Sequence, residues 1–503
     1  MLRTLSLSLL STIGLLLSAT AQPTLDPTFG NNGKVLIDFD GDNDDAQEML
    51  IQPDGRILVS GYGTIDGEVR PIVARLLFDG TLDPAFGTGG RVSLTLPAFA
   101  AIQGMALQPD GKVLVGGNLL IGNGADLFMA RLLPNGALDP DYGTDGISTP
   151  TTSATGGSFW AMALQSDGKV LMSGDDVAGF NSKMMTVRLL ADGALDTAFG
   201  TGGVALTDIG SNNERALAVA VQPDGKILSA GRTAQPGHQE IAVVRLLPNG
   251  QLDTSFDGDG ILQVNISNDE DEASDLILLP DGRILVVGYA SPNSDRDLLA
   301  VMLTTSGGFD PGFGTNGVVV LEAIDNQEVD RVAQDSEGGF VLTCTVEETF
   351  NDIRVLRLSA NGTPDPMYDA TFDINNDDNS SAIAIQADGK VVVAGENNNG
   401  ASESDMLVMR FTAPGTTSIP AIGTVSLSIA PNPSHGRFVA EAATPWSAAT
   451  LVVLHDAQGR LVPMHPTIFN GKVAVDAEQV ASGIYSLTLI DRGRTATERV
   501  VFE

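Results

Sequence analysis

Acidic side chains in the loops are the residues whose types and spacing could do chemistry. The segment DFDGDNDDA at 38–46 places carboxylates at Asp38, Asp40, Asp42 and Asp44. Clustered carboxylate oxygens in a loop are the hard ligands that calcium binds. However, the glycine position of the calcium-loop pattern D-x-[DN]-x-[DN]-G is occupied by Asp45. We therefore favour the alternative, a solvated and charge-rich surface that keeps a β protein soluble.

An arginine that recurs within apolar segments is a second candidate, as in IVARLL at 72–77 and AVVRLL at 242–247. Most copies precede the aspartate of a repeated LDxxFG motif by seven or eight residues. A buried guanidinium requires a partner of opposite charge, so we expect structural ion pairs within the repeats and not a ring of ligand-binding cations. The fifth copy has Met302, which leaves Asp310 to find another partner. The arginines are Arg75, Arg131, Arg188, Arg245, Arg357 and Arg410.

The sequence shows no catalytic motif. The histidines His238, His435, His455 and His465 have neither metal-ligand spacing nor an evident Ser or Cys partner. Cys344, the single cysteine, lies in the strand-like segment FVLTCTV, and we interpret it as buried core. We therefore expect no enzymatic activity and no cofactor. Paired carboxylates that converge from distant repeats remain the alternative.

Repeats are the elements that must position these residues. An Asp-Gly or Glu-Gly turn recurs seven times, at a spacing of 51 to 57 residues. Each turn separates an apolar segment from a β-rich one, as in AVAVQPDGKILSAG at 218–231. A period of this size, with strand-type residues and no helical pattern, predicts a radial or stacked repeat fold. The turn glycines are Gly55, Gly111, Gly168, Gly225, Gly282, Gly338 and Gly389.

Each repeat is predicted to contain four strands. Asp-Gly and Asn-Gly between apolar runs are typical of hairpins with type I′ turns, in which both central residues have positive φ. The seventh repeat lacks its own fourth strand, whereas the chain begins with a spare one after LDPTFGNNG at 25–33. We predict an all-β fold, a seven-bladed β-propeller whose last blade is completed by residues 34–39 through strand exchange, followed by a small antiparallel β-sandwich.

The charge of the chain is strongly negative, with a net value of −35. Residues 22–419 carry 21 basic and 56 acidic side chains. Such a domain repels phosphate backbones, so nucleic acid is excluded as a partner. Much of the acid lies between the fourth strand of one repeat and the first strand of the next, so one face of the propeller should be acidic.

The ends of the chain differ from the repeats in composition. Residues 1–21 combine Arg3, an apolar run and Ala19-Thr20-Ala21, which predicts a signal peptide cleaved between Ala21 and Gln22. No later segment is long and apolar enough to span a membrane. The predicted domains are a signal peptide at 1–21, a propeller at 22–411, a Thr/Pro/Gly-rich linker at 412–424 and a β-sandwich at 425–503.

The C-terminal segment carries motifs with a known resemblance. PNPS at 431–434, VLHDAQGRLV at 453–462 and ASGIYSLTL at 481–489 follow one another in this order. Residues 425–503 resemble the type A sorting domain of the type IX secretion system of Bacteroidota, although the chain ends in ERVVFE without the usual closing lysines. The resemblance implies handling by that machinery, passage through the periplasm, and release or attachment at the outer-membrane surface.

The repeats over 25–411 are similar to the delta-60 repeat β-propeller family, whose hallmarks are a QPDGKILVGG-like hairpin, an RL-x-x-NG turn and LDxxFGxxG. In the sixth repeat, QDSEGGFVLT at 334–343 departs from the hairpin motif. The family implies fold and export but no general activity. We expect a non-enzymatic module that binds an extracellular glycan or protein. The alternatives are a surface polysaccharide lyase or hydrolase, and a structural adhesin or matrix component.

Overall fold

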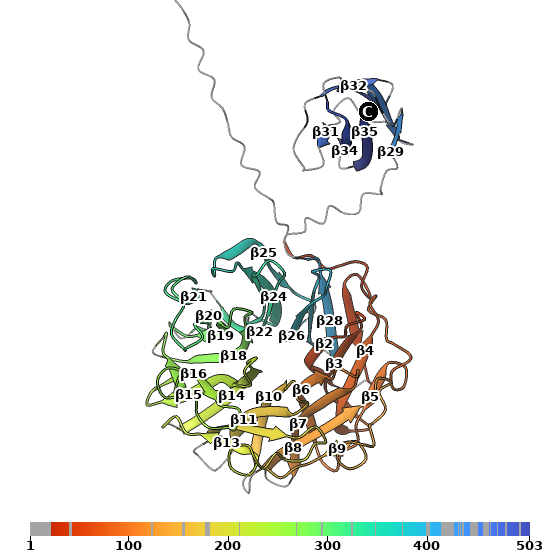
Figure 1. Ribbon diagram of the computed structural model, residues 1–503. Helices are drawn as coiled ribbons and strands as arrows, with labels where there is room; N and C mark the ends of the chain where they lie inside the picture. The colour runs from red at the N-terminus through yellow and green to blue at the C-terminus, as the bar shows by residue number, and fades with distance from the viewer. Residues whose placement is uncertain are drawn as a thin grey trace, which may run out of the picture. The chain divides into compact units, whose positions relative to one another are not determined.

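The computed structural model divides the chain into two compact units, Met1–Thr416 and Thr417–Glu503. All regular elements of the described residues are β-strands (Figure 1). The structure describes residues 22–39, then 43–413 except 122–123, 153–155, 177–181, 211, 268, 293–294, 323–324, 348, 375 and 399–402, and finally parts of 427–502.

The N-terminal unit is built from seven four-stranded antiparallel sheets, which we call blades. In six of them the strands follow one another in chain order. The first blade contains β2 (Asp44–Ile51), β3 (Ile57–Ile65), β4 (Glu68–Leu76) and β5 (Arg91–Ser93). The second contains β6 (Ala100–Leu107), β7 (Val113–Ile121), β8 (Gly124–Leu132) and β9 (Ile147–Ser148). The third contains β10 (Gly157–Leu164), β11 (Val170–Asp176), β12 (Lys183–Leu189) and β13 (Val204–Thr207).

The next three blades keep the same order. The fourth contains β14 (Asn212–Val221), β15 (Ile227–Gln235), β16 (His238–Leu246) and β17 (Ile261–Val264). The fifth contains β18 (Asp271–Leu278), β19 (Ile284–Ala290), β20 (Asp297–Leu303) and β21 (Val318–Leu321). The sixth contains β22 (Asn326–Gln334), β23 (Phe340–Glu347), β24 (Asn351–Leu358) and β25 (Pro364–Phe372).

The seventh blade joins the two ends of the propeller sequence. It contains β26 (Asp378–Ile385), β27 (Val391–Asn398), β28 (Ser404–Phe411) and, as its outer strand, β1 (Lys34–Ile37). Lys34 lies opposite Met409 and Ile37 opposite Met406. The first strands of successive blades contact one another in turn, and β26 contacts β2, so they surround the centre of a ring (Figure 1).

Packing between blades explains the strand sequences. The middle strands, such as β19 and β20, are buried along their whole length because neighbouring blades cover both sheet faces. They therefore consist of nearly continuous apolar runs. The first strand of each blade instead has a β-bulge at the same place, for example between Ala46 and Glu48 and between Val329 and Arg331. A bulge redirects the side chains beside it, and here it does so at the centre of the ring.

The hairpin turns differ from the predicted type. In the first blade Gly55 donates its N–H to the carbonyl of Gln52 at 2.9 Å, and Gln52 donates to the carbonyl of Arg56 at 2.8 Å. Only Gly55, with a φ of 84°, is left-handed in this turn. The turn is thus a type I turn followed by a glycine that forms a β-bulge. The type I′ turn predicted from the Asp-Gly pair is wrong for this hairpin. All seven predicted turn glycines have φ between 82° and 86°.

The C-terminal unit contains two small antiparallel sheets. One has the order β29 (Leu427–Ala430), β30 (Arg437–Ala442), β33 (Lys472–Asp476) and β32 (His465–Phe469); the other has β31 (Leu451–His455), β34 (Gly483–Asp491) and β35 (Arg494–Phe502). Their core includes Phe438, Leu487 and Phe502. Asn432 of the PNPS motif donates to the carbonyl of Arg499 at 2.9 Å, which ties the motif to the last strand.

Candidate functional site

The repeated arginine lies in a buried network that crosses between blades. Arg75 Nε is 2.9 Å from Asp83 Oδ2, which is the aspartate of the LDxxFG motif in the same blade. The guanidinium carbon lies 4.5 Å from the ring centre of Phe86. Arg75 Nη1 also donates to the carbonyl of Pro134 in the second blade at 2.6 Å. The arginine is therefore an ion-pair partner within its blade and a clamp on the next one.

The same geometry recurs around the ring. The aspartate partners are Asp139 for Arg131, Asp196 for Arg188, Asp253 for Arg245 and Asp26 for Arg410, at 2.7 to 2.9 Å. Each arginine also donates to a backbone carbonyl of the next blade. The carbonyl belongs to Ala191 for Arg131, Pro248 for Arg188, Thr305 for Arg245 and Phe78 for Arg410. The last copy joins the chain ends, because Asp26 precedes β1 whereas Arg410 lies in β28.

Two blades depart from this pattern. In the fifth, Asp310 lies 2.9 Å from Arg283 Nη1, and Met302 takes the place of the arginine. In the sixth, Arg357 pairs at 2.6 Å with Asp335 of the first hairpin turn. Arg357 is thus paired within its blade most closely with the turn residue Asp335, and Asp365 at the position of the motif aspartate lies farther away, at 3.7 Å from its Nη1.

Sequence reasoning missed the second cation of each network. Lys112, which follows the turn glycine, lies 3.6 Å from Asp110 and 3.0 Å from Asp139. Equivalent basic residues are Arg56, Lys169, Lys226, Arg283 and Lys390. The recurring Asp-Gly-Lys or Asp-Gly-Arg was the available signal. In the first four blades and the seventh, each network joins two acids to two bases, and it lies on the face with these turns, which we call the turn face.

The network controls the ionisation of its aspartates. Burial opposes ionisation of Asp26, but hydrogen bonds from Thr28 and Lys390 and the charge of Arg410 lower its pKa to about 2. Asp139 shows the same balance: burial works against ionisation, and Lys112 and Arg131 lower the pKa of its carboxyl. These carboxylates are therefore ionised in the folded protein and serve a structural purpose.

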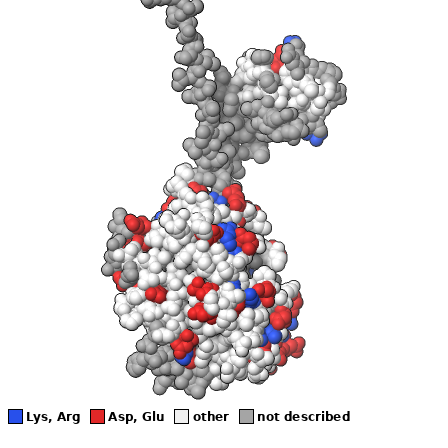
Figure 2. All heavy atoms as spheres, turned by 60° about the vertical axis from the view of Figure 1, so that its left-hand side comes forward, with Lys and Arg blue, Asp and Glu red and all other residues white. Residues whose placement is uncertain are grey.

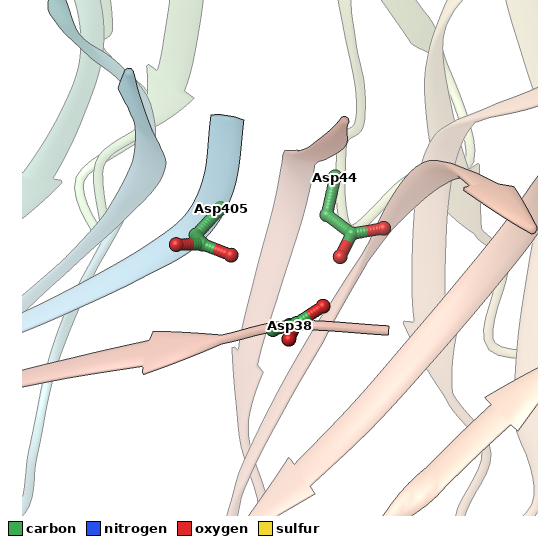
Figure 3. A group of neighbouring side chains, drawn as sticks. All are labelled: Asp38, Asp44 and Asp405. Carbon is green, nitrogen blue, oxygen red and sulfur yellow. The ribbon is translucent and has the colours of Figure 1, made fainter. Parts of the chain in front are cut away.

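The opposite face carries the acidic connections. Carboxylates of Asp38, Asp44 and Asp405, from the ends of β1, β2 and β28, offer oxygens that lie within 4.8 Å of one another (Figure 3). Asp44 Oδ2 accepts the N–H of Phe39 at 2.6 Å. Burial, together with the charges of Asp38 and Glu403, raises the pKa of Asp405. Of the predicted calcium candidates, Asp38 and Asp44 join this group, whereas Asp40 and Asp42 lie outside the described residues.

A similar group of carboxylates lies at the preceding connection between blades, from the sixth to the seventh. We call each such connection a junction. Asp352, Asp373 and Asp378 form a second three-carboxylate group, and Asp378 accepts the N–H of Ile374 at 2.7 Å. Such groups have the oxygen ligands that calcium requires. Red acidic side chains cover more of the propeller surface visible in Figure 2 than blue basic ones.

Between the third and fourth blades the corresponding junction holds an ammonium. Lys183 and Asp208 lie one residue beyond the paired Met184 and Thr207. In the other two junctions the same positions hold Asp405 with Asp38 and Asp352 with Asp373. Lys183 Nζ lies 2.7 Å from Asp208. One junction thus has an ammonium group beside its carboxylates, and each of the other two has three carboxylates together.

A further ionisable cluster lies at the centre of the ring. Arg331 of β22 is 3.6 Å from Glu48 of β2, a contact between the sixth and first blades. Asp275 accepts the N–H of Val332 at 3.0 Å, and Asp330 accepts the hydroxyl of Thr345 at 3.0 Å. Enclosure by protein raises the pKa of Glu48 to about 7 and that of Asp330 to about 6. We call Glu48, Asp275, Asp330 and Arg331 the central cluster.

The central cluster breaks the symmetry of the repeats. Glu48, Asp275 and Arg331 follow the bulge of their blades, and the other four blades have Gly104, Ala161, Ala218 and Ala382 there. Sequence reasoning missed this cluster. Its only signal was the replacement of a small residue at one repeat position, and the proximity of the three blades depends on ring closure.

Clefts on the turn face lie between neighbouring blades. A cleft of about 620 Å³ between the first and second blades is lined by Gln52, Arg75 and Gln108, among others. A larger cleft of about 960 Å³ extends from the second to the fourth blade along Gln108, Gln165 and Gln222. Each is formed by residues that recur in successive blades.

Cys344 is fully buried in β23, and burial raises the pKa of its thiol well above the usual range. The thiol of Cys344 is therefore an unreactive part of the core. At the predicted cleavage site, Ala21 lies outside the described residues, and Gln22 is the first residue that the structure describes.

Comparison with known families agrees with this architecture. Six segments match the family model described as "Domain of unknown function (DUF5122) beta-propeller", at residues 52–86, 108–142, 165–199, 222–256, 279–313 and 386–417. These six matches are to β-propeller repeats of the delta-60 type. The sixth blade, whose arginine pairs differently, is the one without a match.

The C-terminal unit matches the secretion system C-terminal sorting domain at residues 428–503. This protein is therefore exported to the cell surface or secreted. Among the described residues, no helix has the length and apolar character needed to cross a membrane.

Solved structures match this chain at low identity and with TM-scores below 0.5. Chaetomium thermophilum Raptor has a TM-score of 0.47 and 10% identity, over 79% of this chain and 30% of that one. The polysaccharide lyase Uly1 has a TM-score of 0.44 and 12% identity, over 76% and 91%. PorZ, a surface component of the type IX secretion system of Porphyromonas gingivalis, has a TM-score of 0.27 and 11% identity, over 95% and 86%. No curated protein sequence matches this chain significantly.

Replacing Arg410 with methionine, the residue found naturally at position 302, tests the network at the ring closure. We expect a loss of about 3–5 kcal/mol in the free energy of unfolding, because Asp26 loses its guanidinium partner and the chain ends lose their clamp. Urea unfolding provides the measurement. The double variant Arg410→Met/Asp26→Leu should recover part of the loss, and equal stability of the single variant and the wild type would contradict this account.

Replacing Asp405 with lysine copies the natural arrangement of Lys183 and Asp208. The thermal midpoint should rise by a few degrees, because an ion pair worth about 0.5–1 kcal/mol replaces like-charge repulsion. Asp405→Asn, which only removes the repulsion, should give a smaller rise. If the group holds calcium, added calcium will stabilise the wild type but not Asp405→Lys. No rise in either variant would show that the three carboxylates do not repel one another appreciably.

Glu48 should make stability depend on pH. Its pKa of about 7 in the folded protein exceeds the ordinary value of 4.5, so the folded state retains a proton that the unfolded state loses. The contribution of Glu48 to the free energy of unfolding is fully present below about pH 4.5 and is lost as the pH rises through about 7. We expect Glu48→Gln to gain stability relative to the wild type as the pH increases from 5 to 8, measured by urea midpoints. A constant difference would mean that Glu48 has an ordinary pKa.

Proposed function

We propose that this exported propeller is a non-enzymatic module that binds an extracellular glycan on its turn face. The observation that supports the proposal is the recurrence of clefts lined by the same residue types in successive blades. Clefts with a few polar groups among apolar side chains are typical of small-ligand and sugar sites. In the cleft of about 620 Å³, Pro53, Leu107 and Pro134 supply the apolar surface, and Gln52 and Gln108 supply amides.

The distribution of charge supports the turn face as the binding surface. Its lysines and arginines lie between two aspartates, as Lys112 does between Asp110 and Asp139. An uncharged ligand can therefore approach without repulsion. The opposite face holds the three-carboxylate groups, which would repel acidic polymers.

The central cluster favours a second candidate, a polysaccharide hydrolase or lyase. It is not repeated, and a carboxyl with a pKa of about 7, as in Glu48, suits general acid–base catalysis. Binding remains our preferred function because the members of the cluster are engaged with one another and with the backbone. Asp275 accepts two backbone N–H groups, from Leu276 and Val332.

A thermal-shift screen of the chain from Gln22 onward tests the proposed function. Soluble neutral polysaccharides, acidic polysaccharides and calcium are added separately. A ligand at a hundredfold excess over its Kd raises stability by about 2.7 kcal/mol. We expect a neutral glycan to raise the thermal midpoint and an acidic glycan to leave it unchanged. The absence of any shift with glycans would direct the search to a protein partner.

Turnover is examined with the same polymers. We expect no new reducing ends and no unsaturated uronate after prolonged incubation. Product formation by the wild type that disappears in Glu48→Gln would replace the binding proposal with the enzymatic one.

A further inference from the structure

Four equivalent glutamines on the turn face have unpaired amide oxygens among the described residues. Gln52, Gln108, Gln165 and Gln222 each stand just before the turn in the first four blades. Among the described residues, the Oε1 atoms of these four side chains are buried and have no hydrogen-bond partner. The side chain of Gln165 is about nine-tenths buried, with 9% of its surface exposed. A buried carbonyl without a partner costs free energy, so its repetition in four blades requires an explanation.

In the seventh blade the equivalent glutamine has its amide nitrogen unpaired among the described residues, and not its oxygen. Gln386 Oε1 accepts from Arg410 Nη1 at 3.5 Å. Its Nε2, within the described part of the chain, is the atom without a partner. An unpaired oxygen needs a donor, whereas an unpaired amide nitrogen needs an acceptor. A hydroxyl group is both a donor and an acceptor, so a hydroxylated ligand satisfies the amide in either orientation.

The four glutamines line two clefts that adjoin at the hairpin of the second blade. The cleft between the first and second blades and the cleft from the second to the fourth blade share Leu107, Gln108 and Pro109. We call the joined clefts the arc groove. Its walls include Pro53, Pro223 and Pro248, which offer apolar surface to the faces of sugar rings.

The arc groove ends where the repeat changes. In the fifth blade Leu279 occupies the position of the glutamine, and in the sixth Asp335 does so and pairs with Arg357 at 2.6 Å. The unpaired carbonyls therefore form one uninterrupted series over four consecutive blades. A series of identical polar atoms matches a ligand that itself repeats.

We propose that the arc groove binds a neutral, linear polysaccharide whose successive hydroxyl groups pair with the four glutamine amides. This inference rests on the proposed function and adds the class of glycan and the place where it lies. A small rotation of the terminal amide, which is a broad torsion, turns each oxygen toward the groove. Several weak contacts along one chain then act together, which raises affinity far above that of a single contact.

The experiment is isothermal titration of the chain from Gln22 onward with neutral oligosaccharides. The probes are cello-, laminari-, manno- and xylo-oligosaccharides of two to eight sugar units, with oligogalacturonate as the acidic comparison. We expect affinity for one neutral series to rise about tenfold or more between two and six units. Oligogalacturonate should not bind.

Variants locate the site. Gln108→Leu/Gln165→Leu should weaken binding of the six-unit probe about tenfold or more, because two hydrogen-bond partners are lost. Leucine is native at this repeat position in Leu279, and an unchanged thermal midpoint verifies folding. The matched control is Gln386→Leu, the same substitution outside the arc groove, which should leave affinity within about twofold.

The outcomes separate the two proposals. Binding without dependence on chain length, or binding that Gln108→Leu/Gln165→Leu leaves unchanged, would overturn the arc groove and keep glycan binding. Binding only of oligogalacturonate would overturn the neutral ligand class. If no probe of any series binds, the arc groove is overturned and the glycan proposal loses its support on this face.

Discussion

A buried guanidinium that contacts two blades at once is the interaction on which the propeller depends. Arg75 is held by Asp83 within its own blade and reaches the carbonyl of Pro134 in the next. Burial of this charge is acceptable only because its partners are fixed in place. The same contacts made by Arg410 with Asp26 and Phe78 fasten the two ends of the sequence, so the ring is closed by ionic contacts as well as by β1.

Charge is separated between the two faces because each face is made of different connections. Hairpin turns and LDxxFG loops place lysines and arginines in ion pairs with aspartates on the turn face. At two junctions between blades three carboxylates lie close together, whereas at a third Lys183 pairs with Asp208. Ligands of different charge are expected to distinguish the faces.

Function in a repeat protein can come from what repeats or from what breaks the repeat. The arc groove repeats one amide over four blades, which suits an extended ligand. The central cluster replaces small residues with Glu48, Asp275 and Arg331, which suits a single small site. The first strands approach one another most closely at the centre of the ring. Side chains from distant blades therefore meet there, as Glu48 and Arg331 do.

The sequence by itself determined what lies within one repeat. The strand count, the turn glycines and the pairing of Arg75 with Asp83 follow from spacings of a few residues, and the missing fourth strand after Phe411 predicted that β1 would pair with β28. Only the tertiary structure placed Asp405 beside Asp38, Arg331 beside Glu48, and Gln52 in line with Gln222. These contacts join different blades, or opposite ends of the sequence, and their distances are set by ring closure. The turn type was also decided locally by hydrogen bonds that the Asp-Gly pair alone does not specify, since Gly55 alone takes the left-handed conformation.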